Sequence, residues 1–198
     1  MSGGRMNRDD VQAVLGTRSF RDFLEHVVIL DPPPGAGAIP FQPWPHLLQV
    51  CDVLAGVRLL VLLKPRQVGM SWLMAAYALW TAMYHPGARV LLLSLGDRES
   101  KELLRKVAFI YQHLPVRLRE PLKGEGSTEE MLFPGVDSQI LALPSTPNAG
   151  VGFADGLSAL NAHDFDVGGA GLRELLHLHL AQDGPLHEVR VEDQAVSG

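Results

Sequence analysis

The chain has 198 residues, of which 46% are hydrophobic and 20% charged, and its formal net charge is −5 at pH 7. This composition supports a packed core, and the single cysteine, Cys51, excludes an internal disulfide framework, as expected for a reducing compartment. The apolar runs are much shorter than the roughly 20 residues that cross a bilayer, and the polar N-terminus lacks the apolar core of a signal peptide.

The charge is unevenly distributed along the chain. Residues 1–150 contain 15 basic and 14 acidic side chains, whereas residues 151–198 contain 2 basic and 8 acidic ones. The net charge therefore gives no general indication of nucleic-acid binding, and any contact with a polyanion is expected in the first 150 residues.

The N-terminal part of the sequence predicts helices and a loop. Residues 1–30 contain a plausible amphipathic helix with Phe20, Phe23, Leu24 and Val27 on one face. A loop rich in proline and glycine follows from residue 31. Helical spacing of apolar residues returns over 41–57.

Two apolar strands and two helices are predicted next. Leu59–Leu63 and Val90–Leu95 show no polar alternation, which is typical of adjacent parallel strands buried on both faces. Ser71–Tyr84 is predicted to be a helix buried against the sheet, because nearly every face of this helix would be apolar. Asp97–His113 is an amphipathic helix, and its outer face holds Arg98, Lys101, Arg105 and Lys106.

The C-terminal part predicts smaller elements. Met131–Phe133 and Gln139–Leu143 resemble a short hairpin around Pro134-Gly135. A weak strand is expected at 156–160, a short helix at 172–180 and a loosely ordered acidic tail at 182–198. The alternation of strands and helices predicts an α/β fold with a mainly parallel sheet flanked by helices.

Residues 64–71 predict a phosphate-binding loop, because a buried strand precedes them and a helix follows. Backbone N–H groups and the positive end of the helix dipole would then face the phosphates. The usual loop begins with Gly and ends in Gly-Lys-Ser/Thr, whereas here Lys64 stands at the first position and Met70 at that of the lysine. A lysine ammonium acts as a point charge, so Lys64 could reach the phosphates from the other end of the loop. The predicted ATP-binding residues are Lys64, Arg66, Gln67, Val68, Gly69, Met70, Ser71 and Trp72.

Several motifs occur in the order found in the ATPase domain of phage terminase large subunits, which drive DNA packaging, and the chain resembles that family over about residues 40–165. The motifs are Phe41-Gln42-Pro43-Trp44-Pro45-His46, Arg66-Gln67-Val68-Gly69-Met70-Ser71, Pro86-Gly87-Ala88-Arg89-Val90, and Ser138-Gln139-Ile140-Leu141-Ala142-Leu143-Pro144-Ser145. The resemblance implies a nucleoside triphosphate hydrolase fold of the P-loop type. It also implies a motor that couples ATP hydrolysis to translocation of double-stranded DNA into a capsid.

The resemblance also implies roles and partners. Lys64 would hold phosphates, Ser71 would bind Mg²⁺, and Arg66 would be a catalytic arginine finger. Phe41, Trp44 and His46 would form an adenine pocket. ATP and Mg²⁺ would be the cofactors, and double-stranded DNA, the viral portal and the terminase small subunit would be partners. A homo-oligomeric ring in the cytoplasm of the bacterial host is expected, without a membrane.

One family motif is altered in this chain. Members end an apolar strand with Asp-Glu, for the metal and for water activation, whereas this chain has Asn161 and Ala162 there. Asp164 is the candidate substitute metal ligand. Whether the chain is an active ATPase is therefore open, with ATP binding expected rather than hydrolysis. The resemblance implies a nuclease domain beyond this region, so the chain is expected to be a truncated or decayed fragment or the product of a frameshift after about residue 150.

The residues leave other interpretations open. Lys64 and Arg66 could be ordinary strand-end charges or salt-bridge partners, and Ser71 could be only a helix cap. Phe41 and Trp44 could be core residues, the basic face of 98–106 a solvated helix surface, and Asp164 a surface carboxylate.

The expected organisation is a helical or linker segment at 1–40, an incomplete ATPase-like domain at 41–181 and the acidic tail. The alternative functions are a non-catalytic nucleotide- or DNA-binding fragment of a decayed prophage terminase, or another helicase-like translocase.

Overall fold

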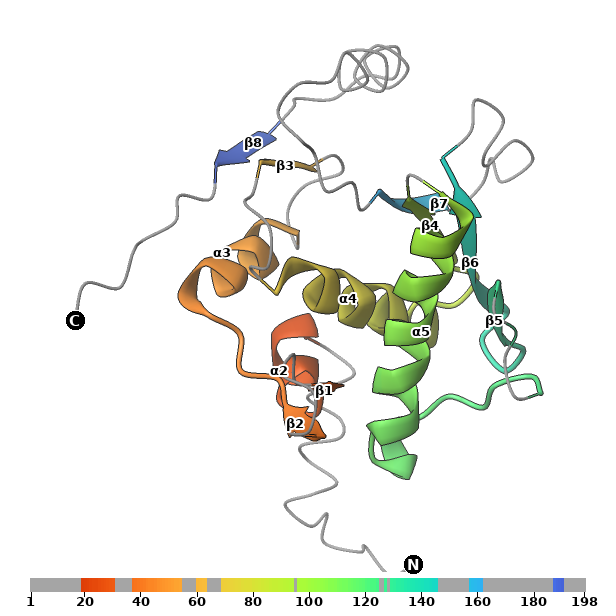
Figure 1. The fold of residues 1–198 in the computed structure, drawn as a ribbon. Helices are drawn as coiled ribbons and strands as arrows, with labels where there is room; N and C mark the ends of the chain where they lie inside the picture. Colours follow the sequence, from red (N-terminus) through yellow and green to blue (C-terminus); the bar gives the residue numbers. More distant parts are fainter. Residues whose placement is uncertain are drawn as a thin grey trace, which may run out of the picture. The chain divides into compact units, whose positions relative to one another are not determined.

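The computed structural model describes residues 19–30, 37–54, 60–63, 69–94, 96–124, 127, 129–145, 157–161 and 187–190 (Figure 1). The chain divides into two compact units. The larger unit combines Met1–Pro43 with Ser71–Ala162, and the smaller unit combines Trp44–Met70 with His163–Gly198. Predictions for other residues, including the helix at 172–180, lie outside the described part.

The larger unit begins with a short helix and a hairpin. Helix α2 (Phe20–Leu24) starts at Ser19, whose hydroxyl accepts a hydrogen bond from the Asp22 amide at 3.4 Å. Strand β1 (Val28–Leu30) then pairs antiparallel with β2 (Ala38–Pro40). The four predicted apolar residues are all buried, but the helix ends before Val27, and the chain enters β1 instead of continuing as a helix.

Two long helices form the body of this unit, and both were predicted. Helix α4 spans Met70–Tyr84, and α5 spans Asp97–His113. Helix α4 is buried on several sides because aromatic rings from α2 and α5 pack on it. The ring pairs are Phe20 with Tyr77, Phe23 with Tyr84, and Trp72 with Phe109. A 3₁₀ turn, η1 (Val116–Leu118), follows α5.

The sheet of the larger unit has four strands in the order β5-β6-β4-β7. The strands are β4 (Arg89–Ser94), β5 (Glu130–Phe133), β6 (Ser138–Pro144) and β7 (Leu157–Asn161). Strand β4 is parallel to both β6 and β7, whereas β5 is antiparallel to β6. The expectation of a mainly parallel sheet is therefore wrong: the sheet is mixed, since the predicted hairpin supplies its edge strand. Helix α5 packs along β4 and β6 (Figure 1).

The smaller unit contains helix α3 (Pro45–Leu54) and a parallel pair of strands, β3 (Leu60–Leu63) and β8 (His187–Arg190). The prediction that β3 and β4 are neighbours is wrong. Both edges of β4 are occupied, by β6 and β7, and β3 pairs with β8. An apolar run indicates a buried strand, but it carries no information about which strand lies beside it.

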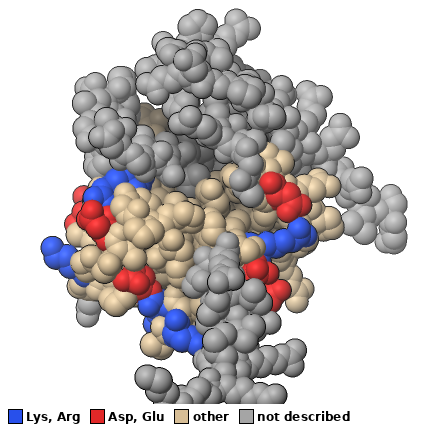
Figure 2. Space-filling model, turned by 180° about the vertical axis from the view of Figure 1, so that it is seen from behind, with Lys and Arg blue, Asp and Glu red and all other residues tan. Residues whose placement is uncertain are grey.

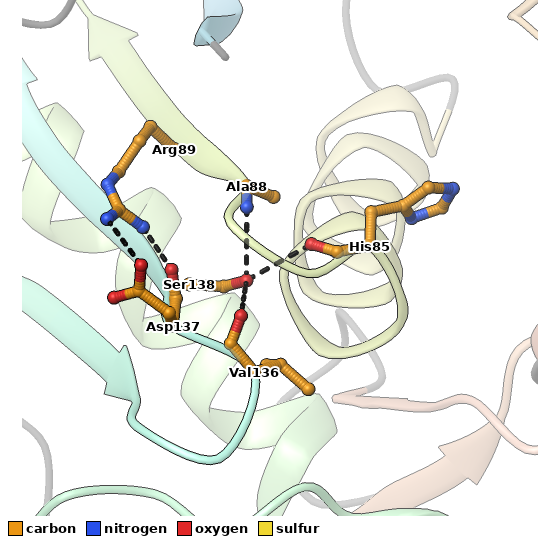
Figure 3. A network of polar contacts seen from close by, with 6 residues as sticks. All are labelled: His85, Ala88, Arg89, Val136, Asp137 and Ser138. Atoms are coloured by element: carbon orange, nitrogen blue, oxygen red, sulfur yellow. Dashed lines mark hydrogen bonds and ion pairs between the residues drawn. The ribbon is translucent and has the colours of Figure 1, made fainter. Parts of the chain in front are cut away.

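A polar network joins the turn after α4 to the β5–β6 hairpin (Figure 3). The Ser138 hydroxyl accepts from the Ala88 amide at 3.1 Å and lies 3.1 Å from the His85 carbonyl, to which it can donate. Arg89 pairs with Asp137, which has a φ of 53° in the hairpin turn. Because Ser138 and Arg89 begin β6 and β4, this network fixes the amino ends of the two parallel strands.

Candidate functional site

Gly69 stands directly before α4 and has a backbone conformation that suits glycine. Its φ is +76°, in the left-handed region. A Cβ atom built on Gly69 would lie 3.1 Å from Leu47 Cδ1, a contact tighter than side chains ordinarily make. Backbone geometry and limited space therefore both favour glycine at this point of the predicted phosphate loop.

The next three residues, Met70, Ser71 and Trp72, begin α4. Met70 occupies the position of the usual loop lysine, and its side chain is packed in the interior, with 4% of its surface exposed. Ser71 and Trp72 remain partly exposed. The first turn of a helix leaves backbone N–H groups without partners inside the helix, and such groups can bind an anion.

Trp72 connects the start of α4 to α5. Its ring centre lies 5.8 Å from the ring centre of Phe109, in an edge-to-face arrangement, and 5.8 Å from the Lys106 ammonium nitrogen. The indole thus lies near an aromatic ring and a cation, both supplied by the middle of α5. The sequence predicted Trp72 as an ATP-binding residue but gave no indication of the contact with Lys106.

Other predicted site residues lie outside the described part: Lys64, Arg66, Gln67, Val68 and Asp164. The altered family motif is described in part. Asn161 is the last residue of β7, where it is paired in register with Leu93 of β4. The position at which the resemblance predicts a metal-binding aspartate therefore falls at the carboxyl end of a parallel strand, the end at which ligands bind in open α/β sheets.

The predicted adenine-pocket residues have contrasting environments. Phe41 is a core residue of the larger unit, with 7% of its surface exposed and its amide donating to the Val27 carbonyl at 2.8 Å. Trp44 belongs to the smaller unit and is 55% exposed. Its ring centre lies 5.5 Å from that of His46, edge to face. Of these rings, Trp44 is the exposed one, and the adenine pocket stays a prediction.

Two of the four basic side chains on the outer face of α5 are paired with carboxylates. Lys101 pairs with Asp97 at 2.9 Å and with Glu129 at 3.1 Å, and these carboxylates raise its pKa. Arg105 pairs with Glu102 at 3.0 Å. Figure 2 shows blue and red side chains interspersed on the described surface of the face it draws. The pairing supports a solvated helix surface here rather than a DNA-binding patch.

A shallow hollow of about 310 Å³ lies toward the opposite end of α4 from Ser71. Its lining residues are Tyr77, Trp80, Thr81, His85, Pro86, Gly87 and Ala88. The hollow lies beside the amino end of β4, away from the carboxyl ends at which ligands bind in such sheets. The sequence did not predict it.

Within the described ranges, no three histidine, cysteine, aspartate or glutamate side chains gather closely enough to hold a metal ion. None of the described helices combines the length and the apolar character needed to cross a bilayer.

Comparison with known proteins identifies a similar fold. No protein-family model matches the chain, and no curated protein sequence matches it. The crystal structure of the large terminase of bacteriophage HK97 superposes with a TM-score of 0.59 at 18% sequence identity. The match covers 88% of this chain and 37% of the terminase chain, so the chain spans little more than a third of that protein. The chain therefore has a fold similar to part of the HK97 large terminase.

Proposed function

We propose that this chain is a nucleotide-binding part of a phage DNA-packaging motor, and that it binds ATP at a P-loop over residues 64–71. The single observation that carries the proposal is the geometry of Gly69. Its backbone has a left-handed φ, it packs close to Leu47, and α4 follows it directly. A loop glycine followed by a helix N-terminus is the arrangement that presents backbone N–H groups to phosphates. The fold similarity to the HK97 large terminase supports the packaging role.

The proposal assigns a role to each part of the loop. Lys64 replaces the lysine that is absent at Met70 and contacts the β- and γ-phosphates as a point charge. Ser71 binds Mg²⁺ through its hydroxyl, which suits a hard cation that prefers oxygen ligands. Arg66 stabilises the charge that develops on the transferred phosphoryl group.

Turnover of ATP is a separate question from binding. Asn161 stands where the family has the metal-binding aspartate, and its side chain brings no negative charge to a metal. The proposal is therefore that the chain binds ATP more readily than it hydrolyses it. Double-stranded DNA, the portal and the small subunit are proposed as partners of the complete motor, inside the bacterial host.

A second candidate, a nucleotide-binding fragment without motor activity, is favoured by the ion pairs that hold Lys101 and Arg105 on the face of α5. The two candidates share ATP binding and differ in DNA binding. A duplex that raises ATP affinity or turnover would support the motor, whereas ATP binding that is indifferent to duplex would support the fragment.

Calorimetric titration with Mg-ATP tests the proposed site. A charge-assisted phosphate contact contributes about 1.5–3 kcal/mol, so Lys64→Ala should lower ATP affinity about ten- to 100-fold. Met70→Leu, which conserves the volume of a buried side chain, is the matched control and should bind ATP as the unaltered chain does. Equal affinity in Lys64→Ala and the unaltered chain would overturn the assignment of Lys64.

A further inference from the structure

We draw no further inference here: the strongest candidate, the shallow hollow near the end of α4 that Tyr77, Trp80 and His85 help to line, carries none, because the indole nitrogen of Trp80 that lacks a hydrogen-bond partner is itself buried and nothing in the structure shows which ligand would occupy the hollow.

Discussion

Leu47 and Gly69 lie so close that a Cβ atom on Gly69 would come within 3.1 Å of Leu47 Cδ1. Gly69→Ala would add this contact to a backbone conformation with a φ of +76° that L side chains rarely adopt. The left-handed backbone alone costs about 1–2 kcal/mol. We expect Gly69→Ala to lower the free energy of unfolding in urea by at least that amount, and to weaken ATP binding if the loop is the phosphate site.

Gly87 provides a matched control for this prediction. Its φ is +78°, nearly that of Gly69, but nothing lies within 4 Å of a Cβ atom built there. Gly87→Ala should therefore show the backbone cost without the steric cost, and should leave ATP affinity unchanged. A larger loss of stability in Gly87→Ala than in Gly69→Ala would contradict the packing of Leu47 on the loop.

Ser138 is a buried hydrogen-bonding centre between α4 and the hairpin (Figure 3). Ser138→Ala would leave the Ala88 amide without its side-chain acceptor in a buried position. The Ala88 amide keeps the His85 carbonyl as an acceptor at 3.1 Å, so the loss is that of an ordinary hydrogen bond. We expect the free energy of unfolding to fall by about 0.5–1.5 kcal/mol. Urea denaturation followed by circular dichroism measures it.

The neighbouring ion pair should contribute far less. The Asp137 side chain is 86% exposed, and exposed pairs contribute about 0–1 kcal/mol. Asp137→Asn removes the charge and keeps a residue type that tolerates a positive φ. Its free energy of unfolding should change by less than that of Ser138→Ala; a larger change would mean that Arg89, rather than Ser138, fixes the hairpin.

Tyr84 should make stability dependent on alkaline pH. Its hydroxyl donates to the Leu118 carbonyl at 2.7 Å, and burial, aided by the charge of Glu120, raises its pKa above the ordinary value of 10.0. A raised pKa means that the folded state holds the proton more tightly. This contribution is fully present below pH 10 and is lost as pH rises through the folded value.

Tyr84→Phe tests this dependence. The variant should lose about 1 kcal/mol of stability at neutral pH, because the Leu118 carbonyl loses its donor. Its free energy of unfolding should then fall less steeply above pH 10 than that of the unaltered chain. Parallel curves for the two proteins would show that Tyr84 does not cause the alkaline loss.

Local patterns in the sequence predicted the long elements well. The helices at 70–84 and 97–113 and the hairpin at 130–144 have strong periodic or turn signals that span their whole length. The helix around Phe20 was predicted too long, since Val27 lies on the same apolar face as Phe23 although the chain has already left the helix. The burial of a side chain does not show whether its backbone is helical or extended.

Strand partners and contacts between helices were not predictable. The apolar runs that became β3 and β4 contain nothing that specifies a neighbour, and only the fold shows that β4 lies between β6 and β7. Gly69 was predicted as an ATP-binding residue from its motif; its φ of +76° suits glycine, and its role stays a prediction. The approach of Lys106 to Trp72 joins residues 34 positions apart, and no spacing rule in a single sequence reports such a contact.

The last prediction concerns ATP hydrolysis and the residues at the carboxyl end of β7. Asn161 ends that strand, and Ala162 follows it in the sequence. Under the proposed function, a metal-binding aspartate and a glutamate that activates water would be expected at these two positions. Loss of a positioned base costs about 10²–10⁴-fold in rate, so we expect little ATP turnover by the unaltered chain. Asn161→Asp combined with Ala162→Glu should raise turnover, measured as phosphate release with Mg-ATP and duplex DNA present.

Two controls make the result interpretable. Asn161→Asp alone restores the metal ligand without the base, and should improve Mg²⁺-dependent ATP binding more than turnover. Asp164→Ala tests whether that carboxylate has taken over as metal ligand. Steady turnover by the unaltered chain that Asp164→Ala abolishes would contradict the assignment of Asn161 and Ala162. A double variant that binds Mg-ATP tightly but stays inactive would show that these two side chains are not what the chain lacks for hydrolysis.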